Sequence, residues 1–243
     1  MQPFLIALQF LTSLPVRLSG MPAPQAVGRS LLHYPLVGLL LGLVLWLGSL
    51  AIEGAALPLQ AALVLAAWVA LTGALHLDGL ADSADAWLGG FGDRARTLAI
   101  MKDPRSGPVA VVVLVLLLLL KFVALWTLLA AGERMALLLA PMLSRGALLG
   151  LFLTTSYVRP GGLGHALAEH LPRAFVRIVL LAVSVFCLVL GTSGWLALTV
   201  SLAIGLLARR AMCRRIGGTT GDTAGALLEL VECGVLVALA LKV

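Results

Sequence analysis

The sequence predicts an all-α membrane protein, a polytopic bundle of about six or seven transmembrane helices forming one integral membrane domain over residues 1–243. Hydrophobic residues make up 61% of the chain and charged residues only 12%, about half the charged fraction of an average soluble domain. The mean hydropathy is +1.08. Residues 178–208 contain no charged side chain, and a membrane-spanning helix needs about 20 mostly apolar residues.

Seven segments have the hydropathy of a membrane span, with ends defined to within several residues. In chain order they are 33–52, 57–75, 108–130, 135–156, 175–191, 194–208 and 224–241. The fifth and sixth are short and meet at a turn, Gly191–Gly194, so they are able to form a hairpin that does not cross fully. Gly38 and Gly42 in the first span form a small-xxx-small pattern, which is typical of packing against another helix or against a second subunit of a homo-oligomer.

Charged residues divide unevenly between the segments that connect these spans. Thirteen of the 17 Lys and Arg residues fall in the N-terminal segment and in those after the second, fourth and sixth spans. Such an excess marks the cytoplasmic side, which predicts a cytoplasmic N-terminus; the family resemblance described below implies that the membrane is the bacterial inner membrane. Most acidic residues fall on the same side, although carboxylates contribute little to orientation, so we expect an active site there. We therefore interpret the net charge of +6 as orientation and contact with anionic groups, not as nucleic-acid binding.

Three aspartates follow the second span on one predicted helix. Asp78, Asp82 and Asp85 are spaced i, i+4 and i+7, which places them within an arc of about 60°. Like charges at this spacing repel one another. A divalent cation relieves the repulsion, and carboxylates on an open face suit Mg²⁺. The alternative is a solvated interfacial helix with incidental acids, but the small residues between the aspartates favour close approach of a substrate or another helix. His76, on the opposite face, is interpreted as a structural or interfacial histidine, with a metal ligand as the alternative.

The loop before the third span carries charges that suit a phosphate-bearing substrate. Lys102, Asp103 and Arg105 lie in it, between Ile100 and Gly107. Positive groups beside metal-bound carboxylates neutralise phosphate oxygens. The alternative is that these residues only anchor the loop to anionic lipid headgroups.

A glycine-rich segment, residues 217–222, leads into the last span. Glycine-rich backbone at a helix start is able to present N–H groups to an anion. Its candidate substrate-binding residues are Gly218, Thr220 and Asp222, and the carboxylate is also a candidate metal ligand. Glu229 shares a helix face with Asp222 and falls within the span, where carboxylates usually face the bundle interior or a cavity. Glu229 and Glu232 therefore either complete the polar wall of the site or pair with Arg145 or Lys121.

Taken together and in order, these motifs resemble the cobalamin synthase family, the adenosylcobinamide-GDP ribazoletransferases. The resemblance spreads over nearly the whole chain, and the ordered set is far more specific than any one piece. The matching segments are 10–16, 33–38, 77–85, 100–107 and 217–222, followed by Glu229 and Glu232. Ala86–Trp87, Pro104 and Pro108 depart from the family pattern and affect local loop shape, but they remove no candidate ligand.

The resemblance implies the substrates, the reaction and the cofactor. A ribose hydroxyl of α-ribazole or its phosphate attacks the pyrophosphate of adenosylcobinamide-GDP, GMP leaves, and Mg²⁺ assists. Attack on a pyrophosphate needs charge neutralisation, in-line positioning and help with the proton of the nucleophile. We expect Asp78 and Asp82 to hold Mg²⁺ and Asp85 to bind metal or act as general base, so that Asp82 and Asp85 are the predicted catalytic residues.

Two other functions compete with this one. A CDP-alcohol phosphotransferase of lipid synthesis would use similar chemistry, but its aspartate motif has a different spacing. A membrane transporter would place polar residues at mid-bilayer in several spans, whereas here most of them concentrate at one surface. Charged residues inside the predicted spans keep this alternative open, namely Lys121, Arg145, Glu229 and Glu232.

Overall fold

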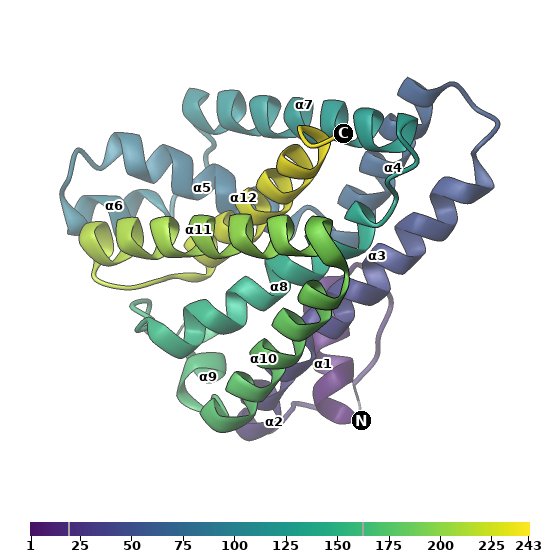
Figure 1. The fold of residues 1–243 in the computed structure, drawn as a ribbon. Coiled ribbons are helices and arrows are strands. Elements are labelled where there is room, and N and C mark those ends of the chain that lie inside the picture. Colours follow the sequence, from purple (N-terminus) through teal and green to yellow (C-terminus); the bar gives the residue numbers. More distant parts are fainter. Residues whose placement is uncertain (19, 162) are drawn as a thin grey trace.

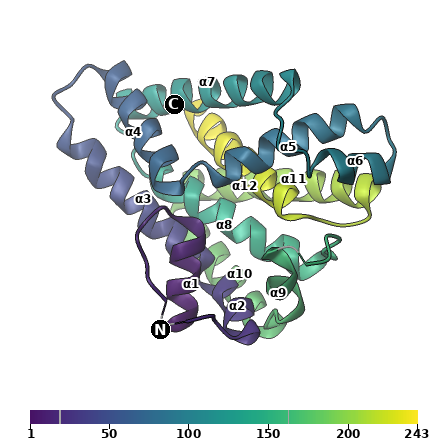
Figure 2. The same cartoon turned by 180° about the vertical axis from the view of Figure 1, so that it is seen from behind.

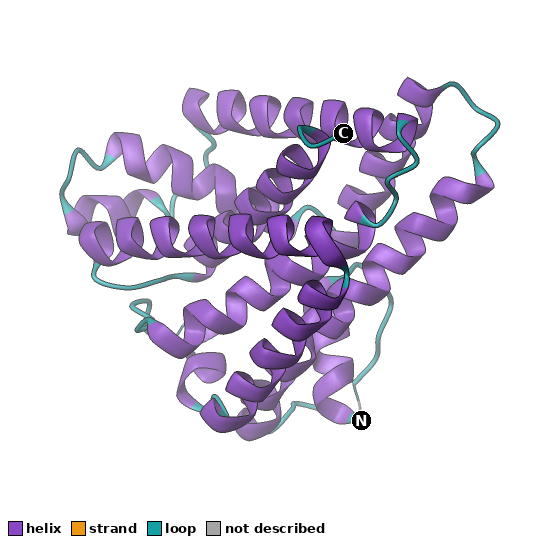
Figure 3. Ribbon diagram, in the orientation of Figure 1, coloured by secondary structure: helices purple, strands orange, loops and turns teal. Residues whose placement is uncertain are grey.

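The computed structural model describes residues 1–18, 20–161 and 163–243, and over these ranges it consists of helices joined by loops, with no named strand (Figures 1 and 3). In chain order the helices are α1 (Gln2–Leu11), α2 (Pro24–Ser30), the 3₁₀ turn η1 (Leu31–His33), α3 (Tyr34–Ala51), α4 (Leu57–Thr72), α5 (Leu75–Gly89), α6 (Arg94–Ile100), α7 (Pro108–Ala130), α8 (Ala136–Thr154), α9 (Leu163–Glu169), α10 (Arg173–Val189), α11 (Gly191–Ile216) and α12 (Gly221–Ala240).

All seven predicted spans are helical, and the all-α membrane architecture is confirmed. In the described part of the chain five helical segments are long and apolar enough to cross a membrane, or six if α4 and α5 together form one bent span. They are Pro24–Ala51, α7, α8, α11 and α12. The sixth span was predicted as 194–208, but α11 is longer, with 26 residues from Gly191 to Ile216. The apolar run of the sequence ends before Arg209, whereas the helix continues past Arg214 and Arg215 to Ile216.

The centre of the bundle is formed by α8 and α12. α12 packs against α5, α7, α8 and α11, and α8 also packs against α3 and α10 (Figures 1 and 2). Leu139 and Leu149 on α8 and Leu228 and Val235 on α12 are fully buried. The outer faces of α3, α7, α10 and α11 instead expose many large apolar side chains. Contiguous apolar surface of that extent is typical of contact with lipid.

The small-xxx-small pattern of α3 is used inside the chain. A Cβ at Gly38 would clash with the backbone of Pro141, and one at Gly42 would lie 2.8 Å from Cα of Leu138. The two glycines therefore let the α3 and α8 backbones touch, as small residues do in membrane bundles. Of the two predicted roles for this pattern, the structure assigns it to packing against a neighbouring helix.

A sharp break between α4 and α5 sets the direction of the aspartate helix. The two helix axes differ by 88°, and the break contains Gly73 (φ 61°) and Ala74 (φ 57°), both in the left-handed region. Ser13 stabilises the end of α4, because its backbone N–H donates to the carbonyl of Leu71 at 2.7 Å and its hydroxyl to that of Ala70 at 2.7 Å. These bonds satisfy carbonyls that the helix end would leave without partners. As a result α5 lies against α7 and α12.

A group of buried charges connects α7, α8 and α12. Lys121 Nζ donates to Glu229 Oε2 at 2.6 Å and to Glu232 Oε2 at 2.7 Å, and it lies 5.2 Å from the ring centroid of Trp68. Arg145 pairs with the other oxygen of Glu232. Two cations and two carboxylates balance, as buried charges must. Of the two roles predicted for Glu229 and Glu232, the structure shows the pairing with Lys121 and Arg145.

Candidate active site

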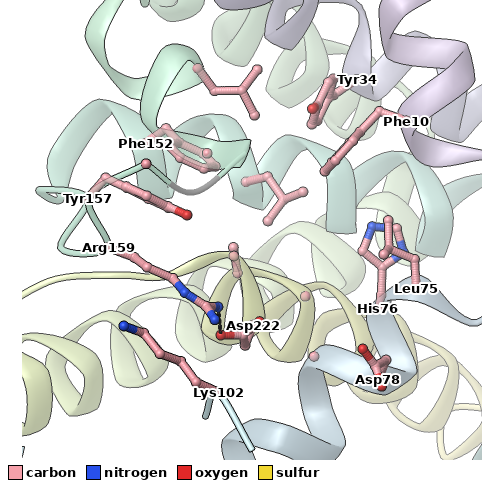
Figure 4. A pocket seen from close by; sticks show the side chains of 18 of the residues that line it. Phe10, Tyr34, Leu75, His76, Asp78, Lys102, Phe152, Tyr157, Arg159 and Asp222 are labelled. Carbon is pink, nitrogen blue, oxygen red and sulfur yellow. Dashed lines mark hydrogen bonds and ion pairs between the residues drawn. The ribbon is translucent and has the colours of Figure 1, made fainter. Parts of the chain in front are cut away.

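A cavity of about 480 Å³ lies between the starts of α5 and α12, the end of α8 and the loop 155–161. Its volume falls in the range of small-molecule sites, roughly 300–1,000 Å³. Figure 4 shows that the cavity has two unlike halves. The aromatic half is lined by Phe10, Tyr34, Phe152 and Tyr157. The polar half is lined by Asp78, Lys102, Arg159 and Asp222.

The polar half depends on close contact between α5 and α12. A Cβ at Gly79 would lie 2.8 Å from the carbonyl oxygen of Asp222, and one at Gly225 would lie 3.3 Å from Cα of His76. Because a side chain at Gly79 would push the helices apart, glycine is required there. The contact brings Asp78 of α5 and Asp222 of α12 to the same cavity.

The loop after α8 is held against the glycine-rich segment by two backbone hydrogen bonds. Thr219 N–H donates to the carbonyl of Ser156 at 2.9 Å, and Val158 N–H donates to the carbonyl of Thr219 at 2.9 Å. This pairing brings Arg159 to the cavity, where its Nη1 lies 2.8 Å from Asp222 Oδ2. Sequence reasoning missed Arg159, since its partner lies 63 residues away along the chain.

The other predicted residues of the glycine-rich segment shape the start of α12. Thr220 is the N-cap, and its side chain accepts from the backbone of Thr223, whose own side chain accepts from Thr220. Such reciprocal capping satisfies helix donors that would otherwise be unpaired. A Cβ at Gly218 would clash with the carbonyl of Ser156, so glycine permits the strand-like pairing with the loop. Gly218 and Thr220 do not line the cavity.

Two of the three residues predicted in the loop before α7 do not line the cavity. Lys102 lines it, because the neighbouring Met101 is buried and anchors the loop. Arg105 instead pairs with Asp103 at 2.7 Å on the surface, where its side chain is 87% exposed. The guanidinium of Arg105 lowers the pKa of Asp103 to about 2. The substrate contacts predicted for Asp103 and Arg105 stay predictions that the cavity lining does not support.

The aspartates of α5 differ in their surroundings. Asp78 lines the cavity, whereas Asp82, one turn further along the helix, does not. Asp82 is half-buried within electrostatic reach of Asp78, Asp222 and Arg159. Asp85 accepts from the backbone N–H groups of Gly107 at 2.5 Å and Ala110 at 3.0 Å. Its carboxylate thus caps α7, where the helix dipole also favours negative charge. The roles predicted for Asp85 in metal binding or as base stay untested, and the structure adds a structural role.

Glu229 lies below the cavity and does not line it. Its carboxylate is bound to Lys121 at 2.6 Å inside the bundle. The contact with substrate predicted for Glu229 is therefore not supported by the cavity lining. Its effect on the site is through α12, which it helps to fix against α7.

The carboxylates suit Mg²⁺ by their chemistry, although they do not form a ready-made cage. In the part of the chain that the structure describes, no group of three or more His, Cys, Asp or Glu side chains is placed to hold a metal ion. Mg²⁺ is usually bound by one or two carboxylates together with waters and substrate phosphates. Asp78, Asp82 and Asp222 supply hard oxygen donors of this kind beside the cavity, so the donor set fits Mg²⁺ once a phosphate substrate completes it.

The aromatic half was not predicted from the sequence. Phe10 stacks with Tyr34 at a centroid distance of 6.2 Å, and Phe152 stacks with Tyr157 at 6.3 Å. Burial raises the pKa of the Tyr157 hydroxyl, which therefore stays protonated and available as a donor. These rings come from α1, α3, α8 and a loop, and no local pattern relates them.

Comparison with known proteins identifies the family. Residues 3–240 match the cobalamin-5-phosphate synthase family. The chain is 71% identical to an adenosylcobinamide-GDP ribazoletransferase of Stutzerimonas stutzeri (strain A1501), covering 100% of this chain and 99% of the relative. It is 67% identical to the enzyme of that name in Pseudomonas entomophila (strain L48), covering 100% of both chains. No solved structure matches. The resemblance predicted from the ordered motifs is confirmed, and the chain belongs to the cobalamin-5-phosphate synthase family.

Proposed function

We propose that this chain is an adenosylcobinamide-GDP ribazoletransferase, which joins adenosylcobinamide-GDP to α-ribazole or its phosphate in the last assembly step of cobalamin biosynthesis. A ribose hydroxyl attacks the phosphorus nearer the corrinoid, and GMP leaves. The observation that supports this most strongly is the two-sided cavity. Carboxylates from α5 and α12 face Lys102 and Arg159 in its polar half, as a pyrophosphate with a metal ion requires.

The positive residues bind and orient the pyrophosphate. Lys102 and Arg159 reach the cavity from separate loops, so they are able to contact different phosphate oxygens. Arg159 neutralises Asp222 in the structure, at 2.8 Å. When substrate is bound, the guanidinium exchanges this carboxylate for phosphate oxygens, which it matches as a planar donor fork.

The carboxylates would hold Mg²⁺, and one of them would take the proton of the nucleophile. Asp78, Asp82 and Asp222 would bind the ion, which supplies charge neutralisation at the pyrophosphate oxygens when bound. Asp82 is the favoured general base, because it lies within electrostatic reach of Asp78 and Asp222, which line the cavity, and its carboxylate has no capping role. Asp85 keeps the start of α7 in place through its bonds to Gly107 and Ala110.

We further propose that the chain lies in the bacterial inner membrane with the cavity open to the cytoplasm. The basic segments that predict this orientation include Arg94, Arg159 and Arg209. The starts of α7 and α12 and the ends of α8 and α11 belong to connections of that same predicted side. The nucleotide substrate and GMP are polar, so access from the aqueous cytoplasm suits them.

The proposed reaction is tested by turnover of the purified protein in lipid. Adenosylcobinamide-GDP and α-ribazole are supplied with and without Mg²⁺, and GMP and cobalamin are measured. We expect metal-dependent, equimolar formation of both. We expect Asp82→Asn to abolish turnover with membrane insertion retained, whereas Glu169→Gln, an exposed acid paired with His165, keeps full activity. Full activity of Asp82→Asn would refute the metal and base assignment. Lipid products in place of cobalamin would indicate a CDP-alcohol phosphotransferase.

A further inference from the structure

The aromatic half of the cavity has its own chemistry, distinct from the charged wall below it. Four rings surround it, and Leu148 and Leu167 complete its surface. None of these side chains is charged, and the tyrosine hydroxyls are the polar groups they offer. Such a surface suits a flat, largely apolar ring, which stacks on aromatic side chains.

His76 lies at the edge of this half, above Asp78 and facing Phe10 in Figure 4. The imidazole is only 4% exposed, and among the described residues neither of its ring nitrogens has a hydrogen-bond partner. Leaving a buried polar group unpaired costs about 1–3 kcal/mol. Its backbone is fixed by contact with Gly225 of α12, so the ring is held in place beside the cavity. An unpaired, positioned imidazole is what a site for a nitrogen-containing ring provides.

Resting on the proposed function, we propose that the aromatic half is the subsite for the base of α-ribazole and that His76 donates a hydrogen bond to its free ring nitrogen. The base then stacks on the aromatic rings, and its ribose extends toward the wall formed by Asp78 and Asp222. The attacking hydroxyl is thereby brought to the pyrophosphate side of the cavity.

Three ring systems of the two substrates compete for the aromatic half: guanine, the ribazole base and the corrin ring. Their chemistry favours the ribazole base. Guanine carries donors and acceptors on its exocyclic groups and ring edge, and most of them would be left unpaired against these rings, which is costly. The dimethylbenzimidazole of ribazole has methyl groups and one free ring nitrogen, which match an apolar surface with a single donor. The corrin ring is several times larger than a nucleoside. It does not fit inside a cavity of about 480 Å³ and would lie at the cavity entrance.

Stacking is tested by ligand affinity of the purified protein in nanodiscs, measured by calorimetry for α-ribazole and separately for adenosylcobinamide-GDP. Phe152→Leu removes a ring but keeps an apolar side chain. We expect about tenfold weaker α-ribazole binding with less than a twofold change for adenosylcobinamide-GDP. The matched control is Phe122→Leu, a ring on α7 paired with Trp126, which should change neither. Tyr157→Leu, in a loop, provides a second variant if Phe152→Leu does not fold.

The hydrogen bond is tested by changing both partners. The indole counterpart of α-ribazole has a carbon in place of the free ring nitrogen. We expect His76→Leu to weaken α-ribazole binding about tenfold and to leave indole riboside binding unchanged, and His76→Gln, which keeps a donor, to recover most of the loss. Equal weakening of both ligands in His76→Leu would refute the hydrogen bond, since it would indicate loss of packing.

The failure of this subsite and the failure of the proposed function give different results. If Phe152→Leu and Tyr157→Leu weaken adenosylcobinamide-GDP and leave α-ribazole unchanged, the aromatic half binds guanine and this inference is wrong. Wild-type protein would still form cobalamin in that case. If wild-type protein releases no GMP from the two substrates, the proposed function fails and the subsite fails with it.

Discussion

The buried carboxylate of Glu232 offers the sharpest test of what holds the bundle together. It accepts from Lys121 at 2.7 Å, from Arg145 and from Ser144 at 3.3 Å, and it is fully buried. Glu232→Gln removes the charge with little change in volume. Two buried cations are then opposed by one carboxylate, that of Glu229, which contacts Lys121.

The expected loss follows from these contacts. Removing one partner of a buried ion pair costs about 3–5 kcal/mol, because the charge left behind stays desolvated. Most of this loss comes from Arg145, because Glu232 is the carboxylate that pairs with it. The Nε and Nη2 atoms of Arg145 already have no hydrogen-bond partner among the described residues. Glu229→Gln should lower the free energy of unfolding by less, about 1.5–3 kcal/mol, because Lys121 remains paired with Glu232. Glu53→Gln, which breaks a surface pair with Arg134, should cost no more than about 1 kcal/mol.

The assay is reversible unfolding of each variant in mixed micelles, followed by circular dichroism. We expect the order of stability to be wild type, Glu53→Gln, Glu229→Gln and then Glu232→Gln. Cavity residues are unchanged, so activity of the surviving folded fraction should remain. If Glu232→Gln were no less stable than Glu53→Gln, the buried charges would not stabilise the bundle, and the reasoning would be refuted.

Further predictions concern the site. Asp85→Ala should destabilise the protein by about 1 kcal/mol through loss of its capping bonds, and Asp85→Asn should restore only part of this, because the amide oxygen accepts from one of the two N–H groups while the amide NH₂ cannot accept; lost turnover in the folded Asn variant would show that Asp85 has a catalytic role as well. Arg159→Gln should reduce kcat/KM for adenosylcobinamide-GDP by about 10–100-fold, the value of a hydrogen bond to a charged group; an unchanged kcat/KM would exclude it from phosphate binding. Gly79→Ala should cost about 1–3 kcal/mol because its Cβ meets Asp222 at 2.8 Å, whereas Gly48→Ala, with nothing within 4 Å, should be neutral in the same unfolding assay.

The predicted site residues divide into those that the structure brings together and those that it separates. Asp78, Lys102 and Asp222 line one cavity, and Asp82 does not. Asp103 and Arg105 pair with each other on the surface. Charge and spacing identify a residue suited to a substrate, but the fold of the loop determines where its side chain points.

The cavity also contains residues to which the sequence analysis gave no role in the site. Arg159 meets Asp222 only because two loops pair through Thr219. Phe10 and Phe152 meet at the cavity because α1 and α8 both contact α3. In a chain rich in apolar residues, one more phenylalanine is indistinguishable from a core or lipid-facing side chain until the helices are packed.

The sequence by itself determined that this protein is a helical membrane protein, where its long apolar helices lie to within several residues and which helix presents aspartates on one face. These properties are local, because hydropathy and the 3.6-residue repeat depend only on neighbours along the chain. The tertiary structure decided which carboxylates face the cavity, that Lys121 and Arg145 share Glu232, and that Asp85 caps α7. These contacts depend on how the helices pack, and close packing depends on small residues such as Gly79. Hydropathy cannot predict them, because burial of apolar surface is non-directional.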